Sequence, residues 1–175
     1  ITGVTVSSGG LYGSNTPPTV TVADAVVDAA ATATLAPFGV QGTDIETYQG
    51  SVWVINGPNF YFSAPGSVVD FATSDGGGNR SSADSFLKVQ YVRVVQTNGL
   101  LFLIADSSIN YISGVQTTGG PPTTTFTNQN ADPEVGTPYP ASVIKVGQNI
   151  WLANSFGIHE MNGATAVKIS DELDG

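Results

Sequence analysis

Three aromatic residues, Trp53, Phe102 and Trp151, lie at equal intervals of 49 residues, and the sequence around each of them is similar. In every copy the aromatic stands in an apolar segment, and a short turn separates that segment from a second one. The paired segments are 52–56 with 60–62, 101–105 with 109–112, and 150–154 with 158–161. A fixed period of this length indicates a repeat architecture in which each copy is one supersecondary unit.

Each copy predicts short antiparallel strands joined by tight turns. Pairs such as Asn56-Gly57 suit the positive φ of a hairpin turn. Three or four such strands per period are typical of a β-propeller blade, and a β-sandwich built from the same hairpins is the alternative. The expected strands are 44–48, 51–55 and 60–63 in the first copy, 89–96, 100–105 and 109–113 in the second, and 141–146, 150–153, 158–161 and 166–169 in the third.

The predicted fold is all-β, a partial β-propeller of about three blades preceded by a small β module. The blades are expected at about residues 40–88, 89–137 and 138–175, and two loops, 74–82 and 117–139, are expected to interrupt them. Propellers usually have about four to eight blades. We therefore expect a longer polypeptide or other subunits to complete the ring, which agrees with a chain that begins at Ile1 instead of Met.

Residues 1–36 differ in composition from the blade region 37–175. Apolar and hydroxyl side chains alternate at 3–6, 18–22 and 32–35, and turn-forming residues fill 9–17. Alternation with a period of two predicts half-buried strands. This segment is therefore predicted to be a small Gly-, Thr- and Ala-rich β module.

Composition excludes several classes of function. The net charge is −9 and the chain has only five Lys and Arg residues, which are scattered, so no cationic patch for nucleic acid is predicted. The absence of cysteine excludes disulfides and thiolate metal sites. No apolar run approaches the roughly 20 residues of a membrane-spanning helix. We accordingly predict no membrane-spanning segment.

Polar residues that could carry chemistry do not form a recognisable site in the sequence. His159 is the only histidine and Glu160 follows it, but neighbours on a strand point to opposite faces, so the pair is a poor catalytic dyad. The acids do not have the spacing of a calcium loop, and we interpret them as solvated turn residues. They are Asp70, Asp75, Asp106 and Asp132.

The remaining motifs also have structural interpretations. Gly76-Gly77-Gly78 lacks the lysine of a phosphate-binding loop, and Asn79-Arg80-Ser81 fits a glycosylation sequon that is common by chance. Exposed aromatics can stack on sugars, but the position of Trp53, Phe102 and Trp151 inside apolar strands predicts packing between blades. No catalytic, cofactor-binding or metal-binding residue is predicted, and the protein is not expected to be an enzyme.

Several stretches resemble the tail nozzle or hub proteins of short-tailed bacteriophages, which extend the conduit below the portal and adaptor. The resemblance covers about four-fifths of the chain, from about residue 38 onward. It rests on residues 48–53, 62–67 with Asp70-Phe71, 106–109 with 112–113, 123–130 and 169–175. It implies β-propeller domains, a ring of six identical subunits in the virion, contact with other tail proteins such as the adaptor, and passage of DNA through the lumen without sequence-specific binding.

The expected function is therefore that of a structural, non-catalytic part of a phage tail that forms a conduit for DNA ejection. An acidic protein with few cations suits a lumen that does not grip DNA. One alternative is a carbohydrate- or host-receptor-binding β module. Another is a hydrolase or lyase on a propeller scaffold, against which the single histidine and the lack of paired acids argue.

Overall fold

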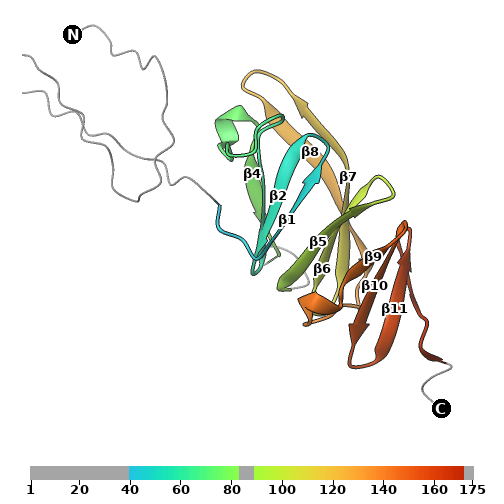
Figure 1. Ribbon diagram of the computed structural model, residues 1–175. Coiled ribbons are helices and arrows are strands. Elements are labelled where there is room, and N and C mark those ends of the chain that lie inside the picture. The colour runs from blue at the N-terminus through green and yellow to red at the C-terminus, as the bar shows by residue number, and fades with distance from the viewer. Residues whose placement is uncertain (1–39, 83–88, 172–175) are drawn as a thin grey trace, which may run out of the picture. The chain divides into compact units, whose positions relative to one another are not determined.

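The computed structural model describes residues 40–82 and 89–171, all within the compact unit Val40–Gly175 (Figure 1). These residues form three four-stranded antiparallel sheets, each a meander in chain order, and none of the sheets closes on itself. The strands predicted within residues 1–36 lie outside the described residues. The described fold is all-β, as the sequence predicts.

The first sheet contains β1 (Asp44–Tyr48), β2 (Ser51–Asn56), β3 (Asn59–Phe62) and β4 (Gly78–Ser81). The second contains β5 (Tyr91–Thr97), β6 (Leu100–Ala105), β7 (Ile109–Thr118) and β8 (Thr123–Asp132). The third contains β9 (Ile144–Val146), β10 (Asn149–Asn154), β11 (Gly157–Asn162) and β12 (Thr165–Lys168). Two short 3₁₀ helices, η1 (Thr73–Asp75) and η3 (Pro140–Ser142), precede β4 and β9.

The 49-residue period is preserved in the strand register. Trp53 pairs with Glu46, Phe102 pairs with Val95, and Trp151 pairs with Ile144. Each partner lies 49 residues after the corresponding partner in the preceding sheet. Equivalent positions therefore occupy equivalent places on the three sheets, and side chains that share a sequence position share a face.

The fourth strands of the first two sheets correct the predicted loops at 74–82 and 117–139. The first loop contains η1 and β4, and a Cβ on Gly78 would lie 2.8 Å from the ring of Phe62, so glycine permits close packing there. The second contains β8, and β7 extends to Thr118. Polarity suggested loops, but β-branched threonines favour strands, and an outer strand needs few buried side chains.

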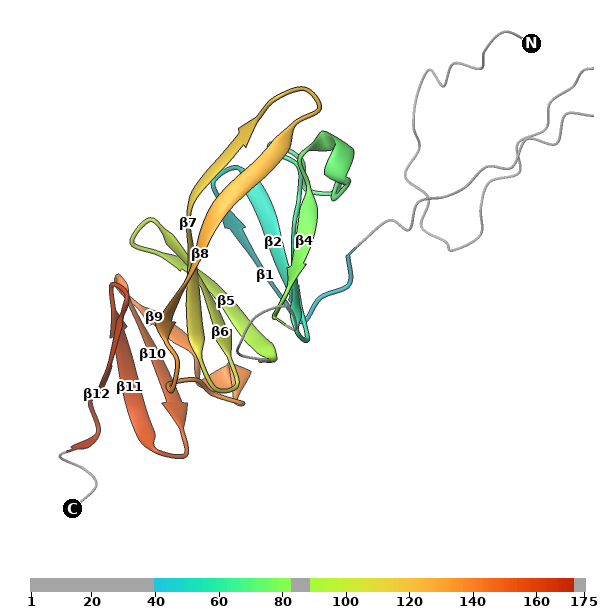
Figure 2. The same ribbon diagram turned by 180° about the vertical axis from the view of Figure 1, so that it is seen from behind.

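Two hydrophobic cores lie between the sheets. One joins the β1–β4 sheet to the β5–β8 sheet, and the other joins the opposite face of β5–β8 to the β9–β12 sheet. Figures 1 and 2 show β5–β8 between the other two sheets. Its middle strand β6 is buried from Leu101 to Ala105 because both of its faces are covered.

The aromatic positions differ in their surroundings. Trp53 and Phe102 are fully buried between sheets, which confirms the predicted packing role for those two residues. For Trp151 the described residues show no such packing, and its packing role stays a prediction. The Trp151 side chain is partly exposed because it lies on the outward face of β9–β12, which no described sheet covers.

Candidate functional site: a pocket between two sheets

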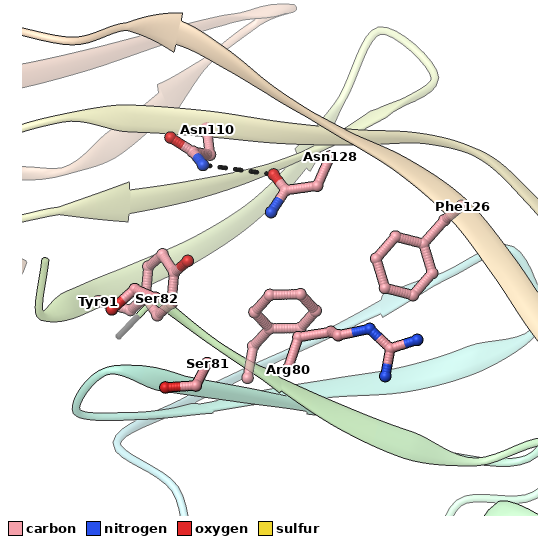
Figure 3. A pocket seen from close by; sticks show the side chains of 8 residues that line it. Arg80, Ser81, Ser82, Tyr91, Asn110, Phe126 and Asn128 are labelled. Atoms are coloured by element: carbon pink, nitrogen blue, oxygen red, sulfur yellow. Dashed lines mark hydrogen bonds between the residues drawn. The ribbon is translucent and has the colours of Figure 1, made fainter. Parts of the chain in front are cut away.

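A pocket of about 270 Å³ opens between the β1–β4 and β5–β8 sheets. Strands β3, β4, β5, β7 and β8 supply its walls, which brings together residues that are far apart in the sequence. Figure 3 shows the lining residues, which are Phe60, Arg80, Ser81, Ser82, Tyr91, Asn110, Phe126 and Asn128.

An arginine and a group of aromatic rings form one side of the pocket. The Arg80 guanidinium carbon lies 5.8 Å from the centre of the Phe126 ring, within the range of a cation–π contact. The Phe126 ring in turn contacts Phe60 and Trp53 at 6.0 and 5.4 Å between ring centres. Arg80 takes part in neither of the two ion pairs found among the described residues. The pocket therefore presents a cation supported by an aromatic surface.

Side-chain amides and a tyrosine form the other side. Asn110 donates from Nδ2 to Oδ1 of Asn128 at 3.3 Å and accepts from Nδ2 of Asn130 at 3.0 Å (Figure 3 shows the first of these bonds). Burial raises the pKa of Tyr91 to about 12, so its hydroxyl stays protonated near neutral pH. These groups donate and accept hydrogen bonds, and none of them is a general base near neutral pH. The pocket therefore offers hydrogen-bonding groups, a cation and an aromatic surface.

His159 and Glu160 lie on opposite faces of β11, as predicted. Glu160 pairs with Trp151 on the outward face, whereas His159 pairs with Leu152 on the face packed against β5–β8. The imidazole is buried, and its Nδ1 has no hydrogen-bond partner among the described residues. Glu160 accepts hydrogen bonds from Asn149 and Trp151. The two side chains do not act together.

The four turn acids have separate roles in local backbone structure. Asp132 accepts from the amides of Glu134 and Val135, both at 2.9 Å. The other three likewise bond to groups near them: Asp70 to the amide of Ala72, Asp75 to the Ser74 hydroxyl, and Asp106 to the amide of Gln90 and the Ser107 hydroxyl. Across residues 40–82 and 89–171, no three His, Asp or Glu side chains gather as metal ligands would.

Sequence reasoning missed the pocket. In the sequence Arg80 is one of five scattered cations and the middle residue of a sequon, and Phe126 lies within the predicted loop 117–139. Gly76–Gly78 belongs to the turn and start of β4, with Gly76 at φ 91°. The run of β-branched threonines around Phe126 in 123–127 is a signal that favours a strand there.

No protein-family model matches the sequence, and no curated protein is significantly similar to it. Among the described residues, the structure contains no helix with the length and apolar character needed to cross a membrane.

Proposed function

We propose that the chain is a structural component of a phage tail, of the nozzle or hub type, and that its sheets are three consecutive blades of a β-propeller. In this proposal identical chains, six by the family resemblance, form a ring in the virion through which DNA passes. The ring contacts other tail proteins such as the adaptor, and the chain catalyses no reaction. The observation that carries the proposal is the repeated way in which each sheet contacts the next.

Successive sheets are linked by equivalent hydrogen bonds. The Tyr48 hydroxyl donates to the carbonyl oxygen of Gly99 at 2.7 Å. One period later, the Thr97 hydroxyl donates to the carbonyl oxygen of Gln148 at 2.8 Å. Both bonds run from the end of the first strand of one sheet to the first hairpin turn of the next. A contact that recurs with the sequence period is what successive propeller blades require.

The order of strands supports the same interpretation. In each sheet the four strands follow one another, and the chain then passes from the fourth strand to the first strand of the neighbouring sheet. The Asp44 carboxylate on β1 adds contacts between the first two sheets. It accepts a hydrogen bond from the amide of Val94 on β5 at 2.8 Å and forms an ion pair with Arg93. Propeller blades have this four-stranded meander and stack face to face.

Charge supports a role in DNA passage. Each phosphate neutralised by a cation adds affinity for DNA and would slow its transit. A chain with a net charge of −9 and five Lys and Arg residues can line a lumen that repels DNA.

Gold-labelled antibodies against the chain, applied to intact phage particles, test the proposal. We expect label on the tail below the portal, in particles that carry six copies. Label confined to the capsid or to infected-cell membranes would refute the tail assignment. A DNA-retention assay adds a second test, in which tight binding of duplex DNA at about 0.15 M salt would contradict the proposed lumen.

The pocket favours carbohydrate binding as a second candidate function. Its aromatic surface, the Arg80 guanidinium and the Asn110–Asn128 amides are the groups that recognise sugar hydroxyls and carboxylates. A glycan array tests this function. We expect signals that Arg80→Ala abolishes and that Lys145→Ala, a cation outside the pocket, preserves. An array without any signal would reject it.

A further inference from the structure

The outward face of the β9–β12 sheet is apolar and open. We call this the open face and define it by Ile144 and Val146 on β9, Trp151 on β10, Ile158 on β11, and Val167 with the following Ile169 at the β12 edge. Five of these side chains are among the exposed large hydrophobic residues of the described chain, and Trp151 is partly exposed. An exposed group of large apolar side chains of this kind is typical of an interaction site.

The equivalent face is buried in the preceding sheet. Val95 is 7% exposed, whereas Ile144, one period later, is 51% exposed. Ile109 is fully buried, whereas Ile158 is 39% exposed. On β5–β8 this face packs against the third sheet, and on β1–β4 it packs against the second. The open face therefore continues a series of two interfaces that already exist within the chain.

The described residues also leave the opposite face of the β1–β4 sheet uncovered at its first strand, whereas Val54 on the second strand of this face is 6% exposed. Ile45 is 63% exposed, whereas its equivalents Val94 and Val143 are 2% and 4% exposed because a preceding sheet covers them. A pocket next to Ile45 is lined by Val40, Gly42, Thr43, Asp44 and Val54. This side has the apolar residue and the recess that could receive side chains of the open face.

The polar groups of the two end faces match as well. At the two internal junctions, a hydroxyl of Tyr48 or Thr97 donates to a turn carbonyl. On the open face the residue equivalent to Tyr48 and Thr97 is Val146, whose side chain cannot donate a hydrogen bond. On the β1–β4 sheet the corresponding turn carbonyl is that of Gly50, which already accepts from the Gly66 amide at 2.8 Å. If the two ends came together, the Gly50 carbonyl oxygen would keep its hydrogen bond to the Gly66 amide, and Val146 would bring no hydroxyl that needs a partner.

One acid lies on the open face. Oε1 of Glu160 accepts from Nδ2 of Asn149 at 2.7 Å and from Nε1 of Trp151 at 3.0 Å. Its carboxylate would therefore enter an interface with two hydrogen bonds already formed, which reduces the cost of removing it from water.

We propose that the open face binds the β1–β4 sheet of a second copy of this chain, head to tail. The β1–β4 sheet of the second copy would lie on the open face of β9–β12 in the way that β9–β12 lies on β5–β8. Head-to-tail contacts close into a ring when the rotation between subunits permits. The described sheets of two copies number six, within the usual propeller range of about four to eight blades. The inference rests on the proposed function, whose six chains would then form three such pairs.

Sedimentation equilibrium of the full chain over a wide concentration range tests the pairing. We expect the wild-type protein to reach twice the 18.0 kDa chain mass, or a multiple of that mass. Val167→Asp on the open face and Ile45→Asp on the other end should each weaken the association at least about tenfold, because each places a charge in an apolar contact. Tyr139→Asp changes an exposed hydrophobic residue outside both faces and should have no effect.

Mixing the two variants distinguishes head-to-tail pairing from a symmetric contact. A Val167→Asp chain keeps an intact β1–β4 end, and an Ile45→Asp chain keeps an intact open face, so the mixture should form a heterodimer that neither variant forms alone. A wild-type chain that stays monomeric, or pairing unaffected by Ile45→Asp, would overturn the proposal. Gold label on phage tails together with a monomeric chain would refute the pairing while leaving the tail assignment standing.

Discussion

Trp53 and Trp151 occupy the same place in the repeat, and replacing each with alanine should have very different effects. Trp53 is fully buried, and its ring centre lies 5.2 Å from that of Phe62 and 5.4 Å from that of Phe126. Its Nε1 donates to the carbonyl oxygen of Tyr48 at 3.1 Å. Truncation leaves a large cavity between two sheets and removes this hydrogen bond.

We expect Trp53→Ala to lower the free energy of unfolding by about 4 kcal/mol, within the usual range for truncating a large buried aromatic. That is a large part of the roughly 5–15 kcal/mol that stabilises a typical domain. Trp151→Ala should cost about 1 kcal/mol in the monomer, because water already reaches one side of the ring. Its hydrogen bond goes to Glu160, which is also partly exposed.

Urea unfolding followed by circular dichroism measures both costs, at protein concentrations low enough to exclude self-association. Trp53→Phe, which keeps an aromatic ring in the core, provides a milder variant and should cost about 1–2 kcal/mol if the alanine variant does not fold. Equal losses at the two tryptophans would refute the conclusion that β9–β12 is the uncovered end of the stack.

Three further perturbations test individual contacts. Ser63→Ala should cost about 1–3 kcal/mol in urea unfolding, because the buried Ser63 Oγ accepts from the Val52 amide at 2.8 Å, whereas the exposed Ser107→Ala should cost less than about 0.5 kcal/mol. Tyr48→Phe and Thr97→Val each remove one of the two equivalent bonds between sheets and should each cost about 1 kcal/mol, and a loss at only one of them would contradict their equivalence. Unfolded tyrosine ionises near pH 10 and folded Tyr91 only near 12, so the unfolded state loses its proton first and stability should fall from pH 10 to 12. The urea midpoint of Tyr91→Phe should fall less over that interval, and parallel pH profiles for the two proteins would show that burial does not control this ionisation.

The sequence predicted the parts of the fold that have a periodic apolar signal. The strands around Trp53, Phe102 and Trp151 are present because each middle strand carries apolar residues on both faces. The opposite orientation of His159 and Glu160 also followed from alternation along a strand. These predictions required only local pattern and spacing.

The outer strands β4 and β8 could not be recognised in the same way. Their residues are mostly polar, and their place depends on partners far along the chain, such as Phe62 beside Gly78 and Gly76 beside Thr124. Tertiary context overrode the local composition.

The pocket and the exposure of Trp151 depend on tertiary arrangement as well. Arg80 and Phe126 are 46 positions apart in sequence and meet only because two sheets stack. Trp151 has the same sequence context as Trp53, and its exposure reflects the number of sheets stacked after it. The similar sequences around Trp53 and Trp151 therefore form the same kind of strand, but the two side chains lie in different environments.

The most direct test of the proposed function is a cryo-electron microscopy map of the tail isolated from the phage. We predict a closed ring of six copies of this chain, with three four-stranded sheets of each chain arranged as propeller blades and a lumen free of clustered Lys and Arg. A ring whose lumen was lined by those cations, or a tail that lacked the chain, would contradict the account.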